Sequence, residues 1–452
     1  MIYKTQKIIS IKRRIKPTDE LVRFIRHNSN KRRYIWNKLV EESRKYENYN
    51  EFTLNNHISE HISRYIQMDI DNIKSRRNSG LDTSLYCSDV IKSVGMDMVN
   101  AAITMRTKDK KDHRLSMFRF KTYDPYRHIF KVRTNNEISK KTSNPKGKVH
   151  FIDETHFKFR ASYNYTKNIF NIELLEPICD EINLKKHKFI TYYKNRPSYK
   201  RCDFHHDDIK EIIFMEELGK FYIMLIVNVT YYVYDDEYDT RLKLAGIDLG
   251  IHNPIALYDK HGILYMRMTS NVISKIHRLI EKTKRLQRVM DMKMTTNKHL
   301  NFINSNHPIY SNNYNKVLLK FRKTWKKIVN LRNHWRYLIA NKIATTYKHI
   351  VVDNFTIPTE FSSNIPIKIR KYINKYNREY GMYLFNEILK HECSKNYCEY
   401  IKSPKCTTSR CNCCGHKNQP LRLNERTFEC EKCGHTIDRD ANAAINCYKS
   451  YN

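Results

Sequence analysis

Apolar and polar residues recur with different periods along the chain, and the changes of period divide it into segments. In residues 3–15, isoleucine partly alternates with lysine and arginine, which predicts an exposed basic strand. From residue 19 to about residue 108, apolar residues recur at helical spacing, and Thr18 or Asp19 can cap the first helix. Between residues 109 and 235, short β-rich runs are separated by polar turns. This pattern predicts a β-barrel that carries the helical segment as an insert.

The second half of the chain mixes strands and helices after an acidic linker at residues 234–239. Residues 242–267 predict three short strands joined by turns, and residues 349–355 predict a buried strand. A further helix is expected at about residues 380–396. The order of elements in this half indicates an α+β segment.

Two amphipathic helices are expected between these strands, the first over about residues 273–290. The second carries apolar residues on one side, at Leu318, Phe321, Trp325, Ile328, Trp335 and Leu338. Its other positions are basic, at Lys320, Lys323, Lys326, Lys327 and Arg336. Either this helix packs in a core and exposes a solvated basic face, or the basic face contacts nucleic acid directly.

The balance of charges narrows the class of partner. The chain has 452 residues with 83 Lys and Arg against 47 Asp and Glu, a formal net charge of +36 that is spread along the whole sequence. Because such a field repels itself unless a polyanion offsets it, nucleic acid is the expected partner, and binding should weaken steeply with salt. Charge alone does not separate a catalytic protein from a structural RNA-binding protein.

No segment predicts a secreted or membrane protein. The first 20 residues lack the apolar core of a signal peptide, and the longest apolar run, residues 221–227, is far too short to span a bilayer. We therefore expect an intracellular protein without a membrane partner. The sequence does not indicate an oligomeric state.

Three aspartates lie at the ends of apolar strands or at the start of a helix, where a carboxylate is expected to have a capping or metal-binding role. Asp248 and Asp353 each end an apolar strand, in LAGIDLG and IVVDNF, although burying a charge is costly unless a metal or another partner offsets it. Asp440 follows in DRDANAAIN, where Asp438 can cap a helix and leave Asp440 in its first turn. Simple capping is the alternative for each aspartate, and it is the better interpretation for Asp438.

The order of these acids, two on strands and one on a helix, is the RNase H-like arrangement. In that arrangement, carboxylates from separate segments converge to hold two Mg²⁺ ions. The ions activate a water and stabilise the attacking and leaving oxygens of a phosphodiester. Hard divalent cations need oxygen ligands, which is why aspartate and glutamate serve in such a site and cysteine does not.

Nine of the 12 cysteines lie between Cys393 and Cys447, and this clustering favours a metal site over a disulfide framework. Two C-x-x-C pairs, each followed by glycine, are separated by 15 residues. The spacing predicts a zinc ion held by Cys411, Cys414, Cys430 and Cys433. Cys413 and Cys406 are close enough to be alternative ligands. Since four thiolates leave no open coordination position, we expect the zinc to be structural.

Taken in order, these motifs resemble the C-terminal half of the TnpB nucleases that transposons encode. Their eukaryotic and giant-virus relatives, the Fanzor proteins, match better, and type V CRISPR effectors share the same RuvC-like core. The resemblance rests on LAGIDLGIHNPIALYD, the paired helices, HIVVDNF, TTSRCNCCG and CEKCGHTIDRDANAAIN. It runs from about residue 240 to the end, whereas the N-terminal half matches only in its texture of a basic β-barrel with a helical insert.

The resemblance implies an α+β multidomain fold with an RNase H-like (RuvC) nuclease core. That core would comprise residues 240–404 and 436–452, with a zinc ribbon inserted at residues 405–435. A β-barrel wedge domain would comprise residues 1–18 and 109–235, with a helical recognition domain at residues 19–108.

The resemblance also implies an RNA-guided, transposon-associated DNA endonuclease that depends on Mg²⁺. A guide RNA of the omega type, encoded beside the gene in this family, and double-stranded target DNA would be its partners. The first and third catalytic acids would be Asp248 and Asp440, and the zinc ligands would be the four cysteines named above. Its location would be the nucleus for a eukaryotic or giant-virus protein and the cytoplasm otherwise.

The second catalytic acid departs from the TnpB pattern, which has glutamate where this chain has the shorter Asp353. Fanzor proteins commonly move this glutamate to a later helix, and here the candidate is Glu392. One face of that helix carries Phe385, Ile388, Leu389 and Glu392. Because an acid in line with an apolar stripe needs a partner, we expect Glu392 to complete the Mg²⁺ site, with Asp353 as the alternative.

Two other functions remain open at this stage. The absence of the usual glutamate is compatible with a guided DNA-binding protein whose nuclease has decayed. RNase H-like sites also perform strand transfer, so a DNA-joining transposase is a third hypothesis. Cleavage of matched DNA separates the first of these from a nuclease, and strand-transfer products from a donor end would identify the second.

Overall fold

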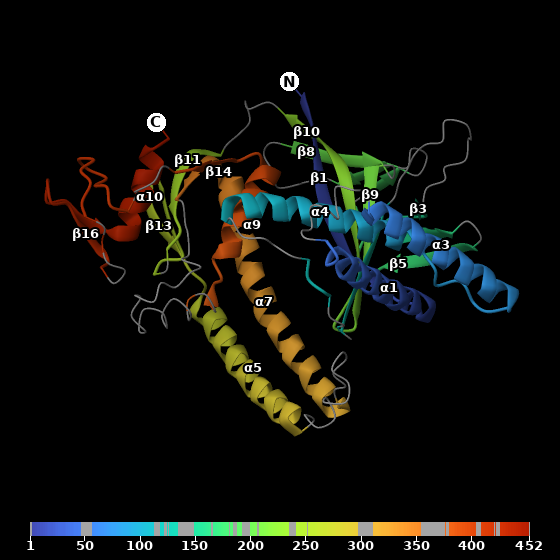
Figure 1. Cartoon of the computed structure of the whole chain (residues 1–452). Helices are drawn as coiled ribbons and strands as arrows, with labels where there is room; N and C mark the ends of the chain where they lie inside the picture. Colours follow the sequence, from blue (N-terminus) through green and yellow to red (C-terminus); the bar gives the residue numbers. More distant parts are fainter. Residues whose placement is uncertain are drawn as a thin grey trace. The chain divides into compact units, whose positions relative to one another are not determined.

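A computed structural model describes the chain in two compact units, Met1–Lys194 with Tyr199–Tyr234, and Asn195–Ser198 with Asp235–Asn452 (Figure 1). The described residues are 2–46, 57–112, 118–121, 124, 126–133, 149–163, 166–179, 181–183, 188–191, 199–205, 208–234, 241–250, 252–296, 311–353, 376, 379–403, 408–419, 421 and 425–451.

The first unit is built on a ten-stranded sheet with the order β3-β4-β5-β1-β10-β8-β7-β6, in which β9 joins β10 to β2. The strands are β1 (Ile2–Lys16), β2 (Arg127–Arg133), β3 (Val149–Phe151), β4 (His156–Tyr163), β5 (Thr166–Leu174), β6 (Glu181–Asn183), β7 (Lys188–Thr191), β8 (Tyr199–His205), β9 (Ile209–Glu217) and β10 (Lys220–Tyr234). The expected N-terminal strand is confirmed, since β1 pairs antiparallel with β10 from Ile2↔Tyr234 to Arg14↔Tyr222.

Three described helices pack in this unit, α1 (Asp19–Ser43), α3 (His57–Asn78) and α4 (Ser88–Asp112). Of the two expected caps, the structure has Thr18, whose hydroxyl accepts from the backbone N–H of Leu21 at 3.2 Å. Phe24 of α1 packs against aromatic rings of the strands, with ring centroids 4.3 Å from Phe170 and 5.5 Å from Phe130. The first half of α1 therefore packs on the sheet, whereas its second half forms a separate apolar core with α3 and α4 that includes Leu39, Tyr65 and Val94.

The second unit contains a five-stranded sheet with the order β13-β12-β11-β14-β15. Its strands are β11 (Leu242–Asp248), β12 (Ile255–Asp259), β13 (Gly262–Met266), β14 (Tyr347–Val352) and β15 (Glu399–Lys402). The first three form an antiparallel meander, as the sequence predicts, whereas β14 is parallel to β11 and β15 is parallel to β14. The ends of β11 and β14 therefore meet at the same edge of the sheet.

Four helices surround this sheet, α5 (Ser270–Thr296), α7 (Asn312–Thr346), α9 (Tyr383–Asn396) and α10 (Arg439–Lys449). α5 and α7 lie side by side as a long hairpin, α9 packs on α7, and α10 packs on β11 and β12 (Figure 1). α10 lies so close to β11 that a Cβ at Gly246 would stand 2.2 Å from the carbonyl oxygen of Ala444. The small residues of DRDANAAIN permit this contact, because Ala441, Ala443 and Ala444 are all buried.

The apolar stripe expected on α7 is only partly right. Ile328 and Trp335 are buried, but Trp325 is 42% exposed and Leu338 is 58% exposed. The buried row of the helix instead advances in steps of four residues, through Thr324, Ile328, Arg332, Arg336, Ala340 and Ala344. Packing thus selects one row of the helix surface, and that row includes two arginines.

Candidate metal sites of the second unit

Asp248 is the last residue of β11 and is almost completely enclosed, with 4% of its surface exposed. Burial raises the pKa of its carboxyl well above the ordinary value, and the negative charges of Asp353 and Asp440 raise it further. Arg439 has the opposite, weaker effect. Asp248 therefore lies in a low-dielectric environment with two further carboxylates close enough to act on it.

Asp353 follows the end of β14 and stands next to Asp248 because the two strands are parallel. Its backbone N–H donates to the carbonyl of Ile247 at 2.9 Å, one step beyond the last strand pair, Ile247↔Val352. Its side chain is half-buried. The convergence of these two strand-end acids follows directly from the strand order.

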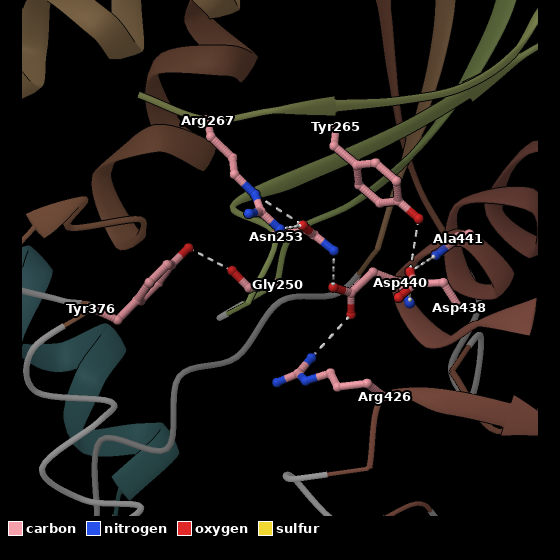
Figure 2. A network of polar contacts seen from close by, with 9 residues as sticks. All are labelled: Gly250, Asn253, Tyr265, Arg267, Tyr376, Arg426, Asp438, Asp440 and Ala441. Carbon is pink, nitrogen blue, oxygen red and sulfur yellow. Dashed lines mark hydrogen bonds and ion pairs between the residues drawn. The ribbon is translucent and has the colours of Figure 1, made fainter. Parts of the chain in front are cut away.

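Asp440 reaches the same place from the first turn of α10. Asp438 is the N-cap, and its Oδ1 accepts from the backbone N–H groups of Asp440 at 3.1 Å and Ala441 at 3.0 Å, so its predicted capping role is confirmed. The hydroxyl of Tyr265 also donates to Oδ1 of Asp438 at 2.9 Å (Figure 2). Burial and this hydrogen bond raise the pKa of Tyr265, so its hydroxyl remains a donor.

The carboxylate of Asp440 has a polar partner at each oxygen. Oδ2 accepts from the side-chain amide of Asn253 at 2.9 Å, and Oδ1 lies 3.5 Å from Nη1 of Arg426. The amide oxygen of Asn253 in turn accepts from Arg267 (Figure 2). No role for Asn253, Arg426 or Arg267 was predicted from the sequence. The sequence signal for Asn253 is its place in GIHNP, in the loop directly after Asp248.

Gly250 lets the loop turn closely on the backbone of Asn253. A Cβ at Gly250 would stand 2.8 Å from the carbonyl oxygen of Asn253, which would have to move, whereas its 3.5 Å distance from Cγ of Asp440 is an ordinary contact. The carbonyl of Gly250 also accepts from the hydroxyl of Tyr376 at 2.5 Å (Figure 2). Gly250, the second glycine of LAGIDLG, thus allows the close turn that follows Asp248.

Within the described part of the chain, the hydrogen bonds and ion pairs of Glu392 are with residues other than the three aspartates. Its Oε2 accepts from the side-chain amide of Asn341 at 3.0 Å, and its Oε1 lies 3.5 Å from the ammonium of Lys395. Asn341 lies near the end of α7, and β14 begins at the residue after that helix. Glu392 therefore lies near the beginning of β14, whereas Asp353 follows its end.

The helical face predicted for Glu392 is nevertheless right. Phe385, Ile388, Leu389 and Glu392 are all buried on α9. The largest charge effects on the pKa of Asp248 come from Asp353 and Asp440, which raise it. The buried glutamate is stabilised by an amide and a lysine, so its burial does not require a metal.

The three aspartates suit a hard divalent cation. Their carboxylates come from the ends of two adjacent strands and the start of one helix, and the enclosed Asp248 is disfavoured as an anion unless a cation offsets its charge. Oxygen ligands of this type are those that Mg²⁺ takes in proteins. Asp248, Asp353 and Asp440 are thus the candidate ligands for such an ion, but among the described residues the ligand atoms that lie within 4.8 Å of one another are those of the four cysteines and not these carboxylates.

Four cysteines form a second, separate site of different chemistry. The sulfur atoms of Cys411, Cys414, Cys430 and Cys433 all lie within 4.8 Å of one another. The Sγ atoms of Cys411 and Cys433 are 3.8 Å apart, and those of Cys414 and Cys430 are 3.5 Å apart. Ligand bonds of about 2.3 Å in a tetrahedron place sulfurs about 3.8 Å apart, so the four residues fit Zn²⁺ and the expected cysteine cluster is confirmed.

The two C-x-x-C turns have the same backbone geometry. In the first, the N–H of Gly415 donates to the carbonyl of Cys411 at 3.0 Å, and in the second that of Gly434 donates to Cys430 at 2.9 Å. Both glycines have positive φ, +74° and +69°. Cys413 is exposed and does not belong to the group of four sulfurs, whereas Cys406 lies outside the described residues.

Three side chains of α10 attach the cysteine cluster to that helix: buried Asn442, and Asn446 and Lys449, which donate to the carbonyls of Arg410 and Asn412. Oδ1 of Asn442 accepts from the backbone N–H of Asn412 at 2.9 Å, and its Nδ2 donates to the carbonyl of Arg410 at 2.8 Å. The second turn connects the two antiparallel strands β16 (Thr427–Glu429) and β17 (Thr436–Asp438), and β17 leads directly into the same helix. The four-cysteine segment therefore braces the helix that carries Asp440.

The basic residues predicted on α7 divide into two groups. Lys320, Lys323 and Lys327 are exposed, and Lys326 is half-exposed. Arg336 is buried, and its guanidinium donates to the carbonyls of Tyr380 at 3.1 Å and Gly381 at 2.7 Å. The prediction that Arg336 contacts nucleic acid is therefore wrong, because this side chain joins α7 to the turn before α9.

Among the described helices, none combines the length and the apolarity that crossing a bilayer requires.

Comparison with known proteins gives matches of three kinds. Residues 383–447 match the family model described as "Cas12f1-like, TNB domain". The putative RNA-guided DNA endonuclease InsQ of Escherichia coli (strain K12) is 21% identical over 251 residues, which cover 53% of this chain and 56% of that protein. The TnpB-like protein L79 of Acanthamoeba polyphaga mimivirus is 23% identical over 207 residues, which cover 45% of this chain and 36% of that protein.

These curated relatives match over about half of their length or less. Among solved structures, a Cas12f1–sgRNA–target DNA complex gives a TM-score of 0.31 at 13% identity, with 99% of this chain and 100% of that chain covered. The mini-RNA-guided endonuclease CRISPR-Cas_phi3 gives 0.40 at 10% identity, with 98% and 92% covered. Scores of this size are too low to support an inference. None of the matches distinguishes the Fanzor proteins from other TnpB-like proteins.

Proposed function

We propose that this chain is a TnpB-like, RNA-guided DNA endonuclease that hydrolyses phosphodiesters with divalent metal ions. The observation that carries the proposal is the convergence of Asp248, Asp353 and Asp440. A sheet with an antiparallel meander followed by two parallel strands supports an RNase H-like (RuvC) core, since it puts two of these acids at one edge. The name of InsQ supports the choice of DNA as the substrate.

We assign the second catalytic acid to Asp353 and not to Glu392. Asp353 contributes to the raised pKa of Asp248 and is tied by its backbone to Ile247. Glu392 is held by Asn341 at the other end of β14. Aspartate is one methylene shorter than the glutamate of TnpB proteins, but the parallel strands bring Asp353 to the site without the extra length.

In this mechanism the side chains of the protein bind the metal ions and orient the carboxylate ligands. Asp248, Asp353 and Asp440 would hold two Mg²⁺ ions, and the ions supply an activated water and charge stabilisation at the phosphodiester. Asn253 and Arg426 contact the two oxygens of Asp440 and limit its rotation. The enclosed position of Asp248 excludes water and strengthens every charge interaction within the site.

The partners follow from charge and from the relatives. The net charge of +36 means that many basic side chains have no acidic residue to balance them and can contact a polyanion. Three exposed lysines, Lys320, Lys323 and Lys327, lie on one helix. We propose a guide RNA of the omega type and double-stranded target DNA as ligands. The name of InsQ, a putative RNA-guided DNA endonuclease, motivates the pair.

The proposal also assigns a role to each part of the chain. The ten-stranded sheet would serve as the β-barrel wedge domain and the helices α1, α3 and α4 as the recognition domain. The second unit would be the RuvC-like nuclease with its zinc ribbon at residues 405–435. The zinc would stabilise structure only, because its four thiolates leave no open position. In a eukaryotic or viral setting the protein would act in the nucleus.

One observation favours a second candidate, a guided DNA-binding protein without nuclease activity. The TnpB glutamate is replaced by Asp353, so one ligand is shorter than in those relatives. The test is to purify the protein with its bound RNA, sequence that RNA, and incubate the complex with matched DNA and Mg²⁺. Cleavage supports the nuclease, whereas tight binding with intact DNA supports the second candidate.

A further inference from the structure

A buried asparagine connects Asp440 to an arginine at the end of a different strand. Asn253 lies in the loop between β11 and β12, and only 3% of its surface is exposed. Its Nδ2 donates to Oδ2 of Asp440 at 2.9 Å, and its Oδ1 accepts from Nε of Arg267 at 3.1 Å and also from Nη2 (Figure 2). Arg267 directly follows β13, and its side chain is largely exposed.

The chemistry of the two outer groups fixes the orientation of the amide between them. A guanidinium only donates hydrogen bonds, and a carboxylate only accepts them. The amide oxygen must therefore face Arg267 and the amide nitrogen must face Asp440. Because Arg267 donates twice to the same oxygen, the amide plane is held at one end while its other end points at Oδ2 of Asp440.

The arrangement leaves one carboxylate oxygen of Asp440 free of this amide. Oδ2 is engaged by Asn253, whereas Oδ1 has only the longer, 3.5 Å ion pair with Arg426. A carboxylate that receives one short hydrogen bond at one oxygen is restricted in rotation about its Cβ–Cγ bond. The direction of Oδ1 is then fixed as well, because the two oxygens of a carboxylate share one rigid plane.

We propose that Asn253 and Arg267 are positioning residues that act in series to orient Asp440 for a divalent cation. This inference rests on the metal site of the proposed function. Arg267 touches Asn253 and not Asp440, so its effect passes through the amide. Hydrogen bonds to metal-ligating carboxylates typically contribute 10- to 100-fold to metal affinity. The alternative is that the hydrogen bonds of Asn253 only stabilise the buried loop between β11 and β12.

The test is a titration of Mn²⁺ by electron paramagnetic resonance, with the full chain carrying its zinc and no nucleic acid. Asn253→Ala and Arg267→Gln are each expected to weaken Mn²⁺ binding about tenfold or more. In the double variant, Arg267→Gln should add almost nothing to Asn253→Ala, because serial effects are not additive. Arg278→Gln, which removes an exposed arginine of α5, is the matched control and should bind Mn²⁺ like the wild type.

Asp248→Ala separates the possible failures. If Asp248→Ala binds Mn²⁺ like the wild type, the proposed metal site is wrong and this inference with it. If Asp248→Ala loses Mn²⁺ while Asn253→Ala and Arg267→Gln keep it, only the inference is wrong. Additive losses in the double variant would overturn the serial arrangement. Should Asn253→Ala unfold, Arg267→Gln decides alone, since its exposed side chain can be shortened without opening the core.

Discussion

The backbone N–H of Asp353 donates to the carbonyl of Ile247 at 2.9 Å, which places Asp353 next to Asp248 where two parallel strands end. On the proposed function, this pairing makes Asp353 the second acid. It depends on the backbone, so it does not require the longer side chain of glutamate. Glu392, which accepts from Asn341, has a structural role in this proposal.

Asp353→Asn is expected to reduce DNA cleavage at least 100-fold, because it removes a charged oxygen ligand from the acids. Glu392→Gln should keep cleavage within a few-fold of the wild type. Its cost should appear as a lower melting temperature, since the variant removes the ion pair with Lys395 at 3.5 Å from a buried position. Single-turnover cleavage rates and thermal unfolding of both variants make the comparison. Loss of cleavage only in Glu392→Gln would reverse the assignment.

Asp248 makes stability depend on pH in a definite direction. Its pKa is raised above the ordinary 3.8, so the folded protein prefers the neutral carboxyl. Stability is therefore lost as pH rises from below 3.8 through the raised pKa. Without divalent cations other than zinc, Asp248→Asn should melt several degrees higher than the wild type at pH 7.5, and the difference should shrink toward pH 4. A wild type that is the more stable protein at pH 7.5 would contradict this account.

Two cysteine variants test the zinc site within the same segment. Cys430→Ser removes one of the four converging sulfurs and should abolish stoichiometric zinc, measured by mass spectrometry of the metal in purified protein. Cys413→Ser is the matched control, because Cys413 is exposed and lies between two ligands of the first turn. It should retain one zinc per chain. Equal zinc loss in both variants would show that the ligand set is wrong.

The basic face of α7 should contribute to RNA binding through charge alone. Replacing Lys320, Lys323 and Lys327 together by glutamine should lower the slope of log affinity against log salt concentration by about 2, because each neutralised phosphate contributes ~0.7 to that slope. Arg336→Gln is the contrasting variant. It should lower the melting temperature and leave the slope unchanged, because the buried guanidinium serves the carbonyls of Tyr380 and Gly381. An unchanged slope in the triple variant would place the RNA elsewhere.

Features that depend on local sequence could be predicted before the structure. Strand ends at Asp248 and Asp353, the cap at Asp438 and the four cysteines each follow from a short pattern of residue types. The buried face of α9 was also right, since helical periodicity assigns a face. Periodicity does not assign a position along the sheet, however, so it could not predict that Glu392 accepts from Asn341 near the end of α7.

Contacts between distant segments could not be predicted in this way. The link from Arg267 through Asn253 to Asp440 joins three elements, and its amide orientation depends on groups 14 and 187 residues away. The burial of Arg336 depends on the carbonyls before α9 and not on the charge pattern of α7. In both cases the tertiary structure supplies the partner that decides the role of the polar side chain.

The central claim is that this chain cuts DNA chosen by a bound RNA, with Asp248 in the metal site. The most direct measurement is cleavage of a plasmid that carries the sequence matched to the copurified RNA, in Mg²⁺, by the wild type and by Asp248→Ala loaded with the same RNA. We expect a cut at the matched site by the wild type and a loss of at least 1000-fold in Asp248→Ala, with RNA binding unchanged. Undiminished cutting by Asp248→Ala, or cutting that ignores the matched sequence, would contradict the account.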